Sequence, residues 1–174
     1  MLPYNIRSKL VTVHGVTVSV SVVEESCFLP TKLSHFRSLL STCLKDRLVV
    51  GVDIKSKSGN AKALILCYRS CCLVIRDLGH LNLQDLFGSL TCTGSKELKG
   101  LLANSAVCFM GMGMKSKLSH LEGNRSNGEI CRTGAELSYL AARILNKPNV
   151  QNYGSAVGHA CLKFSTGFRV TYHT

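Results

Sequence analysis

The sequence predicts a single domain of the mixed α/β class, in which an antiparallel meander is joined to parallel strands and helices flank the sheet. Three observations lead to this prediction. Strand-like runs follow one another in the first half of the chain, helical and strand-like segments alternate in the second half, and 174 residues with 45% apolar content suffice for one buried core. The meander excludes a plain doubly wound sheet, whose strands and helices alternate strictly.

The N-terminal part of the chain predicts a hairpin followed by a helix. Val11–Val23 alternates Val with Thr or Ser on both sides of His14 and Gly15, which is typical of two short antiparallel strands joined by a tight turn. Apolar residues then recur at helical spacing over Lys32–Lys45. Thr31 is the expected N-cap of this helix.

The middle of the chain predicts three consecutive strands. Leu48–Ile54 is a Val-rich apolar run, as expected for a buried strand, and the turn-prone residues Lys55–Asn60 follow it. Ala63–Tyr68 and Cys72–Ile75 are the next two strands, with a turn at Arg69–Cys71 between them.

The second half of the chain predicts alternating elements. In order, we expect helices at Leu81–Leu90 and Lys96–Ala103, a strand at Ala106–Met110, a short helix to Leu121, a strand at Glu129–Arg132 and a helix at Ala135–Leu145 before Pro148. Gly111-Met-Gly113 lacks the other residues of a phosphate-binding loop. These glycines therefore indicate close packing of backbone beside the Leu48–Ile54 strand.

Composition favours an intracellular, nucleic-acid-binding protein. The chain has 21 Lys and Arg against 10 Asp and Glu, a net charge of +11, and basic domains attract polyanions through counterion release. Its nine cysteines are an odd number without a Cys-x-x-Cys pair, so we expect reduced thiols and a cytoplasmic or nuclear location. No apolar run is long enough for a membrane helix, and no membrane partner is expected.

Three segments, in this order and spacing, resemble one known family. Val49-Val-Gly-Val-Asp-Ile-Lys55 is similar to a V-G-x-D-x-E strand, Cys108–Met114 to an F-V-G-V-G-I segment, and Thr133–Ala142 to a D/E-L-x-x-L-A-A helix, which Lys147-Pro-Asn149 follows as in plant members. The family is the DEDD-type 3'-5' exonuclease domain, of the Werner-syndrome type and the RNase H-like superfamily. The resemblance covers about Tyr4 to Gly154. It implies an RNase H-like domain at residues 1–154 and a divergent or truncated tail at 155–174.

The resemblance also implies a metal site that this chain has largely lost. Such enzymes use four carboxylates to hold two Mg²⁺ or Mn²⁺ ions. Asp53 stands at the first acid, but Lys55 and Lys117 replace the next two, and no residue matches the fourth. Asp53 is then a relic, a metal ligand only if a site survives, and Glu136 is a further candidate acid whose alternative is a solvated helix position. We expect an ion pair in which an ammonium replaces the metal charge, and no cofactor.

The expected function is therefore binding without cutting. Lys55, Lys57, Lys115 and Lys117 would then form a basic patch for the phosphates of single-stranded RNA or DNA, and the alternative is a scatter of solvated lysines. Two alternatives stay open. One is an active Mg²⁺- or Mn²⁺-dependent 3'-5' exonuclease that recruits other acids, and the other is a non-catalytic scaffold subunit in a homo- or hetero-oligomer with active relatives.

Overall fold

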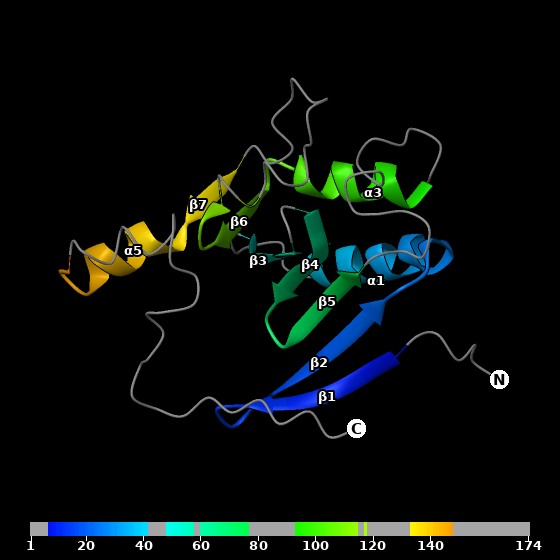
Figure 1. The fold of residues 1–174 in the computed structure, drawn as a ribbon, viewed down its shortest axis with the longest axis horizontal. Helices are drawn as coiled ribbons and strands as arrows, with labels where there is room; N and C mark the ends of the chain where they lie inside the picture. Colours follow the sequence, from blue (N-terminus) through cyan, green and yellow to red (C-terminus); the bar gives the residue numbers. More distant parts are fainter. Residues whose placement is uncertain are drawn as a thin grey trace.

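The computed structural model describes residues 7–41, 48–57, 60–76, 93–114, 117 and 133–147. They form a seven-stranded sheet in the order β1-β2-β5-β4-β3-β6-β7 (Figure 1). The strands are β1 (Arg7–Val13), β2 (Val16–Val23), β3 (Leu48–Lys57), β4 (Asn60–Tyr68), β5 (Cys71–Arg76), β6 (Val107–Gly111) and β7 (Gly134–Glu136). The helices are the 3-10 turn η1 (Ser26–Phe28) and the α-helices α1 (Leu29–Ser41), α3 (Thr93–Leu102) and α5 (Leu137–Ile144).

The sheet is mixed, which confirms the predicted fold class. Antiparallel pairing joins β1 to β2, β3 to β4 and β4 to β5, whereas β2 runs parallel to β5, and β6 runs parallel to both β3 and β7. The predicted hairpin turn is present, since His14 and Gly15 have φ values of 49° and 77°. Two consecutive residues with positive φ match the twist of a two-residue hairpin.

Several predicted boundaries are wrong. Helix α1 begins at Leu29, so Thr31 lies inside the helix and is not its N-cap. Strand β3 continues to Lys57, into the predicted turn at Lys55–Asn60, and Lys57 pairs with Asn60 of β4. Ala135 and Glu136 are strand and not helix, because both pair with β6. The predicted helix at 81–90, the strand at 129–132 and the tail at 155–174 lie outside the described residues.

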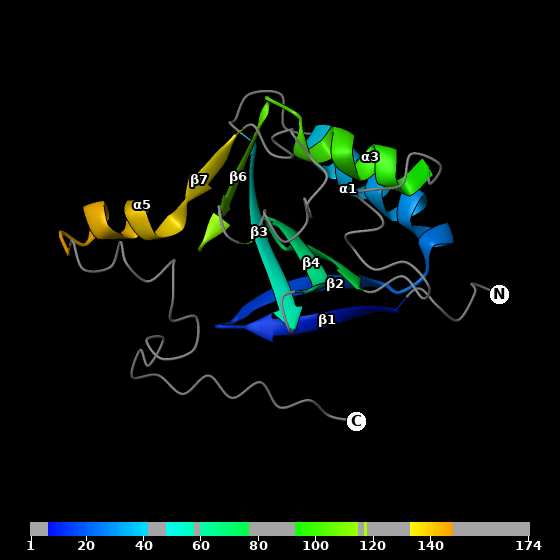
Figure 2. The same cartoon turned by 45° about the horizontal axis from the view of Figure 1, so that its top comes forward.

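The core lies between one face of the sheet and helices α1 and α3, which lie side by side in Figure 2. Val50, Val52 and Ile54 of β3 belong to this core, with at most 6% of each exposed. Because side chains alternate along a strand, the residues between them point to the opposite face. That face carries the candidate site. None of the helices in the described part of the chain has the length and apolarity of a membrane span.

Strands β3 and β6 approach each other closely at Gly111. A methyl group added there would overlap the carbonyl oxygen of Val52 and lie 2.5 Å from the sulfur of Met114. This contact accounts for the predicted close backbone packing. It also sets where the chain leaves β6, and therefore where Lys117 lies relative to β3.

Candidate functional site

Asp53 occupies the sheet face opposite the helices. Its neighbours Val52 and Ile54 are buried in the core, so strand alternation directs the carboxylate away from α1 and α3. Its side chain is 32% exposed, and the backbone N–H of Ile54 donates to Oδ1 at 2.9 Å. Lys55 lies two residues further along β3 and therefore on the same face.

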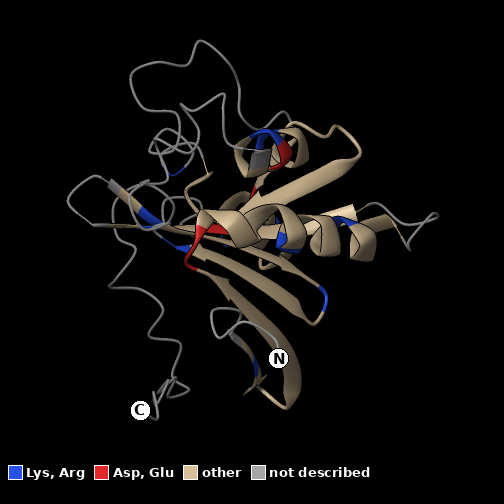
Figure 3. Ribbon diagram, turned by 90° about the vertical axis from the view of Figure 1, so that its right-hand side faces the viewer, with Lys and Arg blue, Asp and Glu red and all other residues tan. Residues whose placement is uncertain are grey.

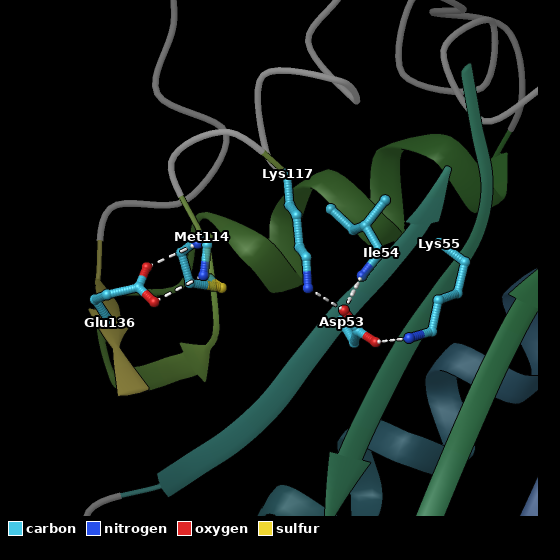
Figure 4. A network of polar contacts seen from close by, with 7 residues as sticks. Asp53, Ile54, Lys55, Met114, Lys117 and Glu136 are labelled. Atoms are coloured by element: carbon cyan, nitrogen blue, oxygen red, sulfur yellow. Dashed lines mark hydrogen bonds and ion pairs between the residues drawn. The ribbon is translucent and has the colours of Figure 1, made fainter. Parts of the chain in front are cut away.

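Two ammonium groups bind the Asp53 carboxylate from different segments of the chain (Figure 4). Lys55 Nζ lies 2.6 Å from Oδ2, and Lys117 Nζ lies 2.5 Å from Oδ1. Lys117 is helical, and its backbone N–H donates to the carbonyl of Gly113 at 2.9 Å. The expected ion pair is present, and it involves both lysines.

The electrostatics of the cluster favour an ionised carboxylate. Burial raises the pKa of Asp53, but the hydrogen bonds and charges of Lys117 and Lys55 together outweigh it and leave the pKa below its usual value. The lysines differ in exposure, since 31% of the Lys117 side chain is accessible against 66% for Lys55. With one carboxylate and two ammonium groups, the cluster carries a net charge of +1.

Glu136 holds a neighbouring backbone turn. Its carboxylate accepts the backbone N–H groups of Gly113 at 2.7 Å and Met114 at 2.8 Å, and the Ser138 hydroxyl at 3.1 Å. Figure 4 shows the carboxylate directed at this turn and not at Asp53. A carboxylate that accepts backbone N–H groups at the start of a helix is a capping arrangement. Glu136 thereby supports the segment that carries Lys117.

The cluster does not fit a pair of divalent ions. Mg²⁺ and Mn²⁺ need oxygen donors, whereas an ammonium nitrogen has no lone pair to donate and repels a cation. Among the described residues, no three His, Cys, Asp or Glu side chains lie together in a group that would hold a metal. Of the predicted site residues, the fold brings together Asp53, Lys55 and Lys117. Lys115 and the side chain of Lys57 lie outside the described part of the chain.

Strand register adds a basic residue that the motif comparison did not identify. Lys55 of β3 lies opposite Ala63 of β4, and Ala63 lies opposite Arg76 of β5, so the two cations flank a small residue on one face. Arg76 also forms an ion pair with Glu24 at 2.7 Å. The pairing of β4 with β5 was predictable from the meander, but not its exact register.

The fold is similar to crystal structures of the EXD2 exonuclease domain. One, soaked in Mn and GMP, gives a TM-score of 0.53 at 22% sequence identity over 73% of this chain and 60% of that chain. Another, soaked in Mg and GMP, gives a TM-score of 0.51 at 20% sequence identity over 88% of this chain and 76% of that chain. The chain thus spans about 60% of the length of the first of these domains. No protein-family model and no curated protein sequence matches the chain. The likeness shows that this chain shares the fold of these exonuclease domains.

Proposed function

We propose that this chain, which has the fold of an exonuclease domain, is a nucleic-acid-binding domain that holds single-stranded RNA or DNA and does not cut it. The observation that carries the proposal is the position of two ammonium groups, 2.6 Å and 2.5 Å from the carboxylate of Asp53. In the metal-dependent chemistry of this fold, that carboxylate would ligate a cation instead.

The lysines disfavour the cutting reaction for an electrostatic reason. A divalent ion at Asp53 would have to displace Lys117, which is partly buried, and then lie beside its positive charge. The charge that a metal pair would supply to a phosphate is here supplied in part by the two ammonium groups. They attract a phosphate oxygen but do not activate a water for attack.

The surroundings of the cluster favour phosphate as the ligand. The cluster has a net charge of +1, and the chain as a whole carries a net charge of +11. Figure 3 shows Lys and Arg distributed over both strands and helices of the described chain. An EXD2 exonuclease domain was soaked with GMP, a mononucleotide phosphate, which supports the same ligand class.

Binding to a 5'-labelled single-stranded oligonucleotide, followed by fluorescence anisotropy over a range of salt concentrations, tests the proposal. Replacing both lysines (Lys55→Ala/Lys117→Ala) should weaken binding and reduce the salt slope by about 0.7 for each lost phosphate contact. Asp53→Asn should strengthen binding, because it leaves both ammonium groups uncompensated. Lys96→Ala, on the exposed side of α3, is the control and should leave both the affinity and the salt slope nearly unchanged.

The same oligonucleotide, incubated with Mg²⁺ or Mn²⁺ and resolved by length, separates this proposal from the active enzyme. We expect its length to stay constant. Progressive shortening from the 3' end that Asp53→Ala abolishes would establish the enzyme instead. If the double lysine variant bound the oligonucleotide with unchanged affinity, the cluster would not be the binding site.

A further inference from the structure

Two cysteines face each other across the β4–β5 hairpin. Cys67 and Cys72 are directly opposed in the antiparallel register, and their Sγ atoms lie 3.0 Å apart. We propose that this pair is a redox-active dithiol, which a small-molecule disulfide such as oxidised glutathione converts reversibly into an intrachain disulfide. The proposal is independent of the proposed function.

The geometry of the pair suits a disulfide. Directly opposed residues of an antiparallel pair have Cα atoms about 4.5–5.5 Å apart, within the range of about 4.4–6.8 Å found in disulfides. The two sulfur atoms must approach by about 1 Å to reach a bond of about 2.05 Å. Both residues are partly exposed, so an oxidant in solution has access to them.

The other described cysteines lack such a partner. Cys71 is adjacent to Cys72 in sequence, but it lies opposite Tyr68 and, by strand alternation, on the other face of the sheet. Cys108 of β6 lies opposite Val49, and Cys27 is exposed on η1. Among the five cysteines that the structure describes, only Cys67 and Cys72 share a sulfur contact.

The surroundings differentiate the two thiols. The hydrogen bond with Cys72 lowers the pKa of Cys67, and this effect exceeds the opposing effects of burial and of the negative charge of Asp53. The same hydrogen bond, together with burial, raises the pKa of Cys72. Since the thiolate is the nucleophile, Cys67 is the residue that attacks first.

The reaction balances as two thiol–disulfide exchanges. The Cys67 thiolate attacks one sulfur of the small disulfide, whose S–S bond breaks, and one small thiolate leaves with the electron pair. Cys72 then loses its proton to solvent and attacks the Cys67 sulfur, which releases the second small thiolate. The two cysteines are oxidised by two electrons, and the small disulfide is reduced to two thiols.

The pair adjoins the Asp53 cluster. Asp53 lies opposite Ile65, and Cys67 is two residues further along β4, on the same face of the sheet. Disulfide formation would remove the ionisable thiol of Cys67 and would link β4 to β5 one residue pair along the sheet face from Asp53.

Peptide mass spectrometry of the full chain tests the proposal. The reduced protein is treated with oxidised glutathione, free thiols are blocked with N-ethylmaleimide, and the protein is digested with trypsin. Cleavage after Lys62, Arg69 and Arg76 separates Cys67 from Cys72. We expect the peptides 63–69 and 70–76 joined by a disulfide in most molecules, and separate and alkylated after dithiothreitol treatment.

Three single variants, each checked by circular dichroism for its fold, identify the sulfur atoms involved. Cys67→Ser and Cys72→Ser should both abolish the cross-linked peptide, and Cys72→Ser should accumulate a glutathione adduct on Cys67. Cys71→Ser is the matched control, because it shares a peptide with Cys72 and should keep the link. Full alkylation of Cys67 and Cys72 after glutathione treatment, or loss of the link in Cys71→Ser, would overturn the proposal.

Discussion

At the scale of the residue, the charge of Asp53 is shared between two cations. Lys55 and Lys117 reach its two oxygens separately, so each carboxylate oxygen has an ammonium partner. Strand alternation alone places Asp53 and Lys55 together, whereas Lys117 arrives from a segment more than sixty residues away. The sequence resemblance pointed to all three positions, and the structure joins them in two ion pairs.

The pH dependence of stability should report this ion pair. Because the pKa of Asp53 is lowered from its usual 3.8, the folded state favours the ionised form, and this stabilisation is present above that value. It is lost as the pH falls below 3.8 toward the folded pKa. Asp53→Asn should therefore reduce the free energy of unfolding by about 1 kcal/mol at pH 7 and by less at pH 3. Urea denaturation at several pH values measures the difference, and a difference that is independent of pH would contradict the assignment.

At the scale of the element, the junction after β6 positions the site. Gly111 lets β6 pack against β3, and the Glu136 carboxylate, from the end of β7, accepts the N–H groups of Gly113 and Met114. The backbone N–H of Lys117 donates to the carbonyl of Gly113, four residues earlier. Three segments distant in sequence thus fix the direction from which Lys117 approaches Asp53.

Two glycine substitutions should distinguish the effect of close packing at Gly111 from the general effect of replacing a strand glycine with alanine. Gly111→Ala should lower the free energy of unfolding by about 1–3 kcal/mol, because the methyl group meets the backbone of Val52, which has little freedom to move. Gly51→Ala is the matched control on the neighbouring strand. Its methyl group would lie 3.6 Å from Cβ of Cys67, an ordinary contact, so we expect a change below about 1 kcal/mol. Equal losses in urea denaturation would show that the close approach at Gly111 is unimportant.

At the scale of the whole molecule, a sheet with the fold of an exonuclease domain carries a positively charged cluster on one face. The mixed sheet has α1 and α3 on one face and Asp53 on the other, and the core residues include neither Asp53 nor the two lysines. The core and the cluster therefore lie on opposite faces of the same sheet.

Inverting the charges of Lys55 and Lys117 should create a metal site. In Lys55→Glu/Lys117→Asp, three carboxylates would face one another, and Mn²⁺ at ten times its dissociation constant would stabilise the fold by about 1.4 kcal/mol. Thermal unfolding should then shift upward by about 3–6 °C in that variant and not in the wild type. Lys9→Glu/Lys96→Asp makes the same change of charge at two exposed positions distant from Asp53 and serves as the control. A Mn²⁺-dependent shift in the wild type would contradict metal exclusion.

The sequence by itself determined the fold class, the hairpin at His14-Gly15, the meander and the position of Asp53 on a buried strand. These features follow from local periodicity, turn chemistry and motif order, which are readable along the chain. Tertiary pairing decided the rest. Ala135 and Glu136 became strand because β6 offered hydrogen-bonding partners, and the pairing of β4 with β5 placed Cys67 against Cys72. Such contacts depend on register and approach between distant segments, and a one-residue slip would reverse the face of every side chain involved.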